Sequence, residues 1–240
     1  MKERPFADVP KTVLVGLALM LSLHMTLKAF EGRPAAGLSD LTPAPSVTIL
    51  RLASLGDPAP LAKMMMLYVQ SFDMHAANPI RYQAMNYDGL IGWLTRILQL
   101  DPHSQYPLHT ASRIYAEVPD PARQRKMLDF VYAQFLIDPK RRWPSLAHAA
   151  YIARHQLKDL DLARRYATAI QAHAQGPDIP LWARQMEAFI LEDMDELEAA
   201  RIMIGGFIAS GQVKEPGELR FLEERLVQIE QRLKPRNADK

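Results

Sequence analysis

The residues best suited to bind a metal are concentrated between positions 64 and 85. This stretch contains Met64, Met65, Met66, Met74, His75 and Met85. Outside the cytoplasm, thioether sulfur and imidazole nitrogen can hold Cu(I). The side chains of three consecutive helical residues fan out around the helix, however, so only one or two of these methionines could share an ion. Copper handling, or an envelope enzyme seated in segment 64–85, is therefore the alternative function and not the leading one.

Other candidates for chemistry are few. His148 and His155 lie seven residues apart, which places them on one helix face but about 10 Å from each other, too far to share one metal ion. The sequence contains no glycine-rich phosphate loop, no HExxH and no GxSxG motif. It also lacks cysteine, which excludes disulfides, thiolate metal sites and a lipid-bearing cysteine. We therefore expect no catalytic residue, no metal site and no cofactor, and a protein that is not an enzyme.

Charged residues are distributed unevenly and indicate where partners could bind. Residues 103–184 hold 12 Lys and Arg against 7 Asp and Glu, whereas residues 185–233 hold 5 against 11. Opposite charge on two parts of one surface would orient a partner and speed its association. Solvated faces with intrachain ion pairs are the alternative. The residues that we expect to contact a partner are Arg113, Arg123, Arg125, Lys126, Lys140, Arg141, Arg142, His148, His155, Glu192, Asp193, Asp195 and Glu196.

The overall composition limits the classes of protein. The chain has 240 residues, is 48% hydrophobic and carries a formal net charge of +2. That length suits one domain of about 200 residues or two small ones. The hydrophobic content argues against general disorder, and the near-neutral charge gives no basic field for nucleic acid. Nucleic acid is therefore not an expected partner.

A membrane anchor is expected near the N-terminus. Residues 12–27 read TVLVGLALMLSLHMTL and contain no Asp, Glu, Lys or Arg, and Lys11 and Lys28 bound them. Sixteen helical residues span about 24 Å, slightly less than a hydrocarbon core of about 30 Å, and the lysine side chains can bridge the difference. We predict an uncleaved transmembrane helix, with a cleaved signal peptide or a buried soluble helix as alternatives.

Positive charge predicts the orientation of that helix. Lys2, Arg4, Lys11 and the terminal amine precede the apolar stretch, whereas Lys28 and Arg33 follow it. The positive-inside rule then places the N-terminus in the cytoplasm and the remainder in the periplasm, at a bacterial-type inner membrane. We divide the chain into a short N-terminal segment (1–11), a transmembrane helix (12–30), a stalk rich in Pro, Gly and Ala (31–56), a helical repeat domain (57–233) and a C-terminal tail (234–240).

Beyond residue 57 the apolar residues recur with the 3.6-residue period of a helix, so we predict an all-α domain. The expected helices cover residues 61–72, 87–100, 107–116, 121–137, 144–155, 162–174, 181–191, 196–209 and 218–233. Four prolines that follow apolar helices, Pro102, Pro139, Pro177 and Pro216, are 37, 38 and 39 residues apart. A near-constant period is typical of stacked helical hairpins.

These residues resemble the tetratricopeptide (TPR) family over about residues 87–233. The resemblance depends on the helix ends ILQLDP and FLIDP, on Trp143 and Trp182, and on the small residues Ala163 and either Ala199 or Ala200. It implies a right-handed solenoid of helical hairpins that binds protein or peptide through the first helix of each hairpin. The residues that it would place there are Arg113, Tyr115, His148, Tyr151, His155, Arg184 and Glu187.

The expected function is therefore that of a non-catalytic scaffold, assembly factor or accessory subunit of a membrane or envelope complex.

One segment allows two interpretations. Residues 61–72, LAKMMMLYVQSF, are apolar on nearly all sides, so a helix there must be covered on several sides. Either the first hairpin buries it, or it docks on the membrane surface or on a neighbouring transmembrane subunit.

Overall fold

The computed structural model describes residues 10–30, 41–72, 85–176 and 178–238. The chain divides into two compact units, Met1–Ser39 and Asp40–Lys240. The described residues form eleven α-helices and one short 3-10 helix, and no strand occurs among them. The prediction of an all-helical protein is confirmed for this part of the chain.

Unit 1 contains one described element, helix α1 (Lys11–Phe30). Apolar residues surround this helix on all sides. Within the described ranges, no helix combines the length and the apolar content that are needed to cross a bilayer. The transmembrane helix that we predicted over residues 12–30 is thus without support from the structure.

The second unit begins earlier than the sequence indicated. Residues 47–53 form helix α2 (Val47–Ala53), and Leu41 and Leu50 are buried in the core. The indole nitrogen of Trp93 donates a hydrogen bond of 2.7 Å to the carbonyl of Thr42. The predicted stalk is therefore wrong for residues 41–56, because two leucines in this proline-rich segment pack against the first helices. Residues 31–40 lie outside the described residues.

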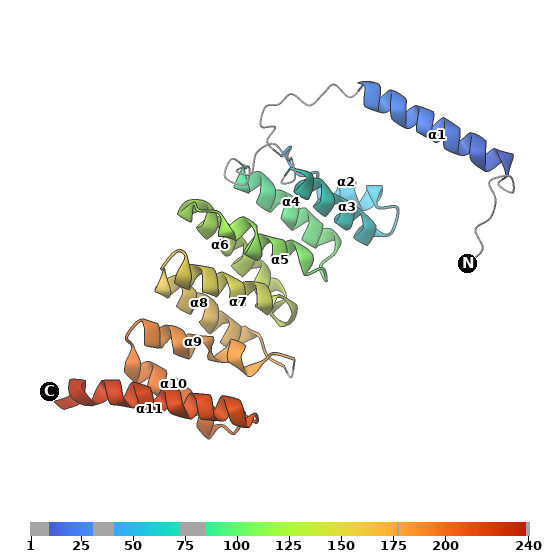
Figure 1. Ribbon diagram of the computed structural model, residues 1–240. Coiled ribbons are helices and arrows are strands. Elements are labelled where there is room, and N and C mark those ends of the chain that lie inside the picture. The colour runs from blue at the N-terminus through green and yellow to red at the C-terminus, as the bar shows by residue number, and fades with distance from the viewer. Residues whose placement is uncertain (1–9, 31–40, 73–84, 177, 239–240) are drawn as a thin grey trace. The chain divides into compact units, whose positions relative to one another are not determined.

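The helices of unit 2 are stacked in chain order (Figure 1). After α2 come α3 (Pro58–Ser71), α4 (Tyr87–Leu100), α5 (Tyr106–Arg113), the 3-10 helix η3 (Tyr115–Glu117), α6 (Pro121–Ile137), α7 (Pro139–His155), α8 (Leu160–His173), α9 (Leu181–Asp193), α10 (Leu197–Ala209) and α11 (Pro216–Ala238). Consecutive helices contact one another, and α4 also contacts α6, as α5 contacts α7. This is the packing of a helical repeat array, in which each helix covers its neighbours.

Aspartate and proline together fix where several helices begin. The side chains of Asp120 and Asp138 accept hydrogen bonds from backbone N–H groups in the first turns of α6 and α7, and proline follows each aspartate. Proline suits this position because the first N–H groups of a helix have no intrahelical partner. Helix α7 therefore begins at Pro139, one turn before the predicted start at Pro144, which lies inside the helix.

Prolines also mark the odd-numbered helices. Pro107, Pro139, Pro180 and Pro216 stand at the starts of α5, α7, α9 and α11. These helices begin 33, 42 and 35 residues apart, so the hairpins vary in length. The near-constant period that we predicted used Pro102, which follows α4, and Pro177, which lies outside the described residues. The helices thus pair repeatedly along the chain, but the length of the repeat in the sequence is not constant.

Alanine permits the closest helix approach in the array. Ala149 and Ala153 on α7 are fully buried, as are Ala163 and Ala167 on α8, and these two helices pack against each other. The buried apolar residues form two clusters that meet in α9. One extends from Leu41 to Ile190, and the other comprises Ala188, Leu191 and residues of α10 and α11.

One buried charge joins neighbouring repeats. Arg142 is only 4% exposed, and its guanidinium donates to the carbonyls of Gln134 at 2.8 Å and of Pro102 at 3.1 Å. Burial lowers the pKa of Arg142, and the charge of Asp138 opposes that effect. Because Arg142 satisfies two backbone carbonyls inside the fold, it is a structural residue and not the exposed partner contact that the sequence indicated.

The turn between α2 and α3 is strained at a leucine. Leu55 has a φ of 51°, in the left-handed region that residues with large side chains rarely adopt, and it is 95% exposed. The Leu55 side chain does not contribute to the stability of the fold, because it is not buried and it disfavours the left-handed backbone conformation.

We expect Leu55→Asn to raise the free energy of unfolding by about 1 kcal/mol, because asparagine tolerates the left-handed region better. Urea denaturation followed by circular dichroism measures the change. Leu52→Asn is the matched control, since Leu52 is also exposed but lies within α2. Equal effects of the two substitutions would contradict the proposed strain.

Candidate partner-binding surface

The odd-numbered helices α5, α7, α9 and α11 each present one exposed aromatic side chain. The residues are Tyr106, Tyr151, Trp182 and Phe221, and each is between 50% and 52% exposed. We call these four residues the aromatic row. Half-exposed aromatic rings are costly on a soluble surface, and they are the residues most enriched in protein interfaces.

Side-chain contacts show that the odd-numbered helices are neighbours. The rings of Trp143 on α7 and Trp182 on α9 meet edge to face with centroids 5.5 Å apart. Phe189 on α9 lies 5.9 Å from Phe221 on α11. Helix α5 contacts α7 directly. The four helices therefore form one side of the stack, with the aromatic row distributed along it.

Two hollows lie between these helices. The hollow between α5 and α7 has a volume of about 330 Å³ and is lined by Gln105, Tyr106, His109, Ser112, Arg113, Pro144 and Ser145. The hollow between α7 and α9 is smaller, about 90 Å³, and is lined by Ala150, Tyr151, Arg154, His155, Met186, Phe189 and Ile190. Each hollow thus combines an aromatic residue of the row with cationic or imidazole side chains.

Ring contacts support the aromatic side chain at the centre of this surface. The rings of His148 and His155 lie 5.8 Å and 4.5 Å from the ring of Tyr151, one on each side along α7. The spacing of the two histidines that the sequence indicated is therefore used to support an aromatic residue. Supported rings lose little conformational entropy on binding, which favours a contact site.

His148 is held in a mixed electrostatic environment. Its Nε2 lies 3.2 Å from a carboxylate oxygen of Glu117. Burial lowers the pKa of His148, the hydrogen bond with Glu117 raises it, and the charges of Arg113 and His109 lower it further. The net effect is a pKa below the ordinary 6.5, so the neutral imidazole is favoured in the folded protein.

Most of the predicted basic contacts have partners within the chain. Arg125 pairs with Asp159 at 2.7 Å, Lys126 with Asp88 at 2.7 Å, Arg123 with Asp120 at 3.3 Å and Arg141 with Asp138 at 3.1 Å. Arg123 also lies over the ring of Tyr87. Intrachain pairing, the alternative interpretation of the charge pattern, thus describes these four residues. Arg113 and Lys140 are exposed, and the described residues provide no ion pair for either.

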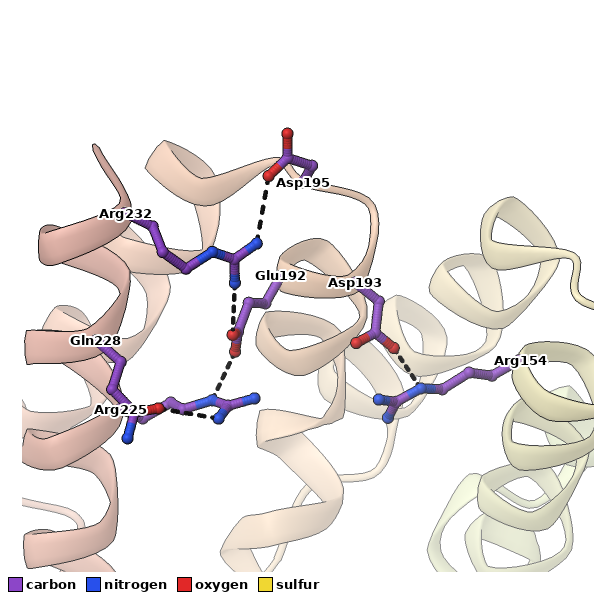
Figure 2. A network of polar contacts seen from close by, with 7 residues as sticks. All are labelled: Arg154, Glu192, Asp193, Asp195, Arg225, Gln228 and Arg232. Carbon is purple, nitrogen blue, oxygen red and sulfur yellow. Dashed lines mark hydrogen bonds and ion pairs between the residues drawn. The ribbon is translucent and has the colours of Figure 1, made fainter. Parts of the chain in front are cut away.

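The acidic cluster at the C-terminal end of α9 is similarly engaged, as Figure 2 shows. Glu192 is 7% exposed and receives Arg225 at 2.7 Å and Arg232 at 3.0 Å, both from α11. Asp195 lies 3.3 Å from Arg232, and Asp193 pairs with Arg154 on α7. These carboxylates attach α11 and α7 to the hairpin turn. Glu196, which precedes α10, is exposed and is not part of this network.

The TPR resemblance placed two residues on the surface that the structure buries. Tyr115 is fully buried, and Glu187 is 8% exposed and lies 3.5 Å from Arg164. Arg184, from the same set, is half-buried and contacts Gln212 at 3.3 Å. Only Arg113, His148, Tyr151 and His155 of that set line the surface described above.

The methionine segment does not converge on one point. Met65 and Met66 are buried, Met64 is 66% exposed, and Met85 packs against the core. Met74 and His75 lie outside the described residues. Within the described ranges, no group of three or more His, Cys, Asp or Glu residues could hold a metal ion.

Tyr106, Trp182 and Phe221 are not among the partner contacts that the sequence indicated, so three members of the aromatic row were missed. A usable signal was present, because Tyr106 and Trp182 lie within two residues of the prolines that begin α5 and α9.

No known protein family, characterised protein or solved structure matches this chain.

We expect Glu192→Gln to destabilise the protein by about 1 kcal/mol, because it removes the charge that two arginines share, each of them partly exposed. Hydrogen exchange should show the loss first in α11. Glu196→Gln is the control and should change stability little. An equal effect at both positions would contradict a specific role of Glu192 in attaching α11.

We also expect His148 to make stability pH-dependent. Its folded pKa is lowered, so the unfolded chain takes up the proton first, and the stabilisation present above about pH 6.5 is lost as the pH falls toward the folded value. Comparing urea denaturation at about pH 7.5 and about pH 5.5 should show a smaller change for His148→Gln than for the unmodified chain. His173→Gln, at an exposed position on α8, is the control.

Proposed function

We propose that this chain is a non-catalytic, TPR-like scaffold that binds a protein segment along the aromatic row and is attached to a membrane by α1. The single observation that carries the binding proposal is the aromatic row itself. Four successive odd-numbered helices each expose one aromatic side chain on a surface with two hollows.

The chemistry of the surface supports an acidic partner. Arg113, His109 and His155 line the hollows, whereas Glu117 is engaged by His148 and Asp193 by Arg154. Cationic groups that border aromatic rings favour a segment in which carboxylates alternate with apolar side chains. The apolar side chains would enter the hollows, and the carboxylates would meet Arg113 and the imidazoles.

The apolar surface of α1 supports attachment to a membrane. Val13, Leu17 and Leu21 belong to a helix that is apolar on all sides, and unit 1 contains no other described element to cover it. Lys11 begins this helix, and its side chain can reach the headgroups. With the charge difference across α1, this favours an N-terminus in the cytoplasm and unit 2 in the periplasm of a bacterial-type inner membrane.

Site-specific photo-crosslinking tests the binding proposal. We expect a photoreactive amino acid at Tyr151 to capture a partner in native membranes, and Arg113→Glu to reduce that capture at least tenfold, as loss of a cation–carboxylate contact predicts. A photoreactive residue at Ile202 is the matched control, because Ile202 is 67% exposed but lies on α10.

Two results would contradict the proposal. One is equal capture from Tyr151 and Ile202, which would indicate contact without a preferred surface. The other is capture at Tyr151 that Arg113→Glu leaves unchanged and that peptides rich in aspartate and glutamate do not compete for. The first result rejects the aromatic row as the site, and the second rejects the acidic class of partner.

A further inference from the structure

The two ends of unit 2 differ in chemistry. The outward side of the last helix, α11, carries exposed charged residues, among them Arg220, Glu223, Glu224 and Glu230. At the first helices, the exposed residues instead include five large apolar ones, Ile49, Leu52, Leu55, Met64 and Leu67, with exposures between 61% and 95%. We call these five residues the apolar end. A repeat array in water needs a polar outer face on each terminal repeat, whereas the large side chains exposed at this end are mostly apolar.

The apolar end is formed by faces that point away from the core. On α3, Met65, Met66 and Val69 are buried, while Met64 and Leu67 lie on the opposite side of the same helix. On α2, Leu50 is the buried residue, and Ile49 and Leu52 are exposed. Helix α3 is therefore apolar on two sides, of which the fold covers one.

Leu55 is the most exposed residue of this group, and the fold does not account for it. It occupies a left-handed turn that asparagine or glycine would fit better, and the adjacent Gly56 has a φ of 96°. A large apolar side chain that costs free energy both through its backbone and through its hydration needs a contact outside unit 2 to explain it.

We propose that the apolar end rests on the surface of the membrane to which α1 is attached, with Leu55 inserted among the lipid chains. This inference depends on the membrane attachment proposed above. Residues 31–46 connect α1 to α2, and sixteen residues reach at most about 55 Å even when fully extended. The chain itself therefore limits how far α2 can lie from the bilayer that holds α1.

Charge supports a lipid surface as the occupant. Arg51 and Lys63 are exposed on α2 and α3, beside the apolar end, and both are suited to contact anionic headgroups. The nearby Asp57 caps α3, its carboxylate accepting a bond from the N–H of Ala59. A symmetric contact between two copies would instead bring Arg51 and Lys63 of both chains to one interface, where like charges repel.

Insertion at this end would fix the direction of the array. Helices α5 to α11 follow the apolar end in stacking order, so the aromatic row lies progressively farther from α2 and α3 (Figure 1). The membrane would thus hold the first hairpin, and the partner surface would extend away from it.

Fluorescent labelling of the full chain tests this inference, and the absence of cysteine makes single labels straightforward. An environment-sensitive NBD group is attached to Leu55→Cys, and the full chain is reconstituted into vesicles of phosphatidylcholine and phosphatidylglycerol. We expect a blue-shifted, several-fold brighter emission, and quenching by nitroxides placed in the upper acyl chain, about 5–10 Å below the headgroup boundary. Glu224→Cys on α11 is the control and should remain aqueous.

A second variant separates insertion from folding. Arg51→Glu with Lys63→Glu should reduce the blue shift at position 55 in vesicles that contain phosphatidylglycerol, while Arg220→Glu, at the other end of unit 2, should not. Failure of the full chain to float with vesicles would overturn the membrane attachment by α1. Flotation with an aqueous label at position 55 would overturn the present inference alone, as would a blue shift without lipid that grows with protein concentration, which indicates a second copy.

Discussion

The structure of unit 2 depends on the mutual burial of short helices. Its helices are mostly 13 to 17 residues long and expose apolar side chains that only the next helix can cover. Helices of that length are marginal when isolated in water, so each is stable because its neighbours pack on it. The fully buried alanines of α7 and α8 allow close approach, and Arg142 joins α7 to the carbonyls of preceding segments. Every other feature described above is supported by this stack.

Local capping signals explain which predictions succeeded, and burial by distant helices explains which failed. The range predicted for α6, residues 121–137, is the observed one because Asp120 and Pro121 begin the helix and Asp138 and Pro139 begin the next. These are local signals, and the sequence contains them completely. Helix α2 was missed because prolines and glycines nearby made its segment resemble a linker, although Leu41 and Leu50 are core residues. Their burial depends on α3 and α4, which lie later in the chain.

The candidate site was less predictable because its electrostatics are nonlocal. Arg125 and Asp159 are 34 residues apart, and Glu192 and Arg232 are 40 apart, so the charge blocks did not indicate which groups pair. Conversely, His148 and His155 were correctly placed on one helix face, but the hollow beside Tyr151, the residue that they support, is completed by α9 and could not be predicted from spacing. Spacing along a helix is predictable, whereas exposure depends on the neighbours.

The division of the buried residues into two clusters affects how the array responds to force. Both clusters include residues of α9, Ile190 in the first and Ala188 in the second, so this helix serves as a common wall. Bending of the stack would concentrate there, since side chains on the two sides of α9 belong to separate cores. The small hollow beside Tyr151 lies along the same helix. Bending of the array at α9 would thus change the width of this hollow. A partner bound in the hollow would therefore oppose bending at α9.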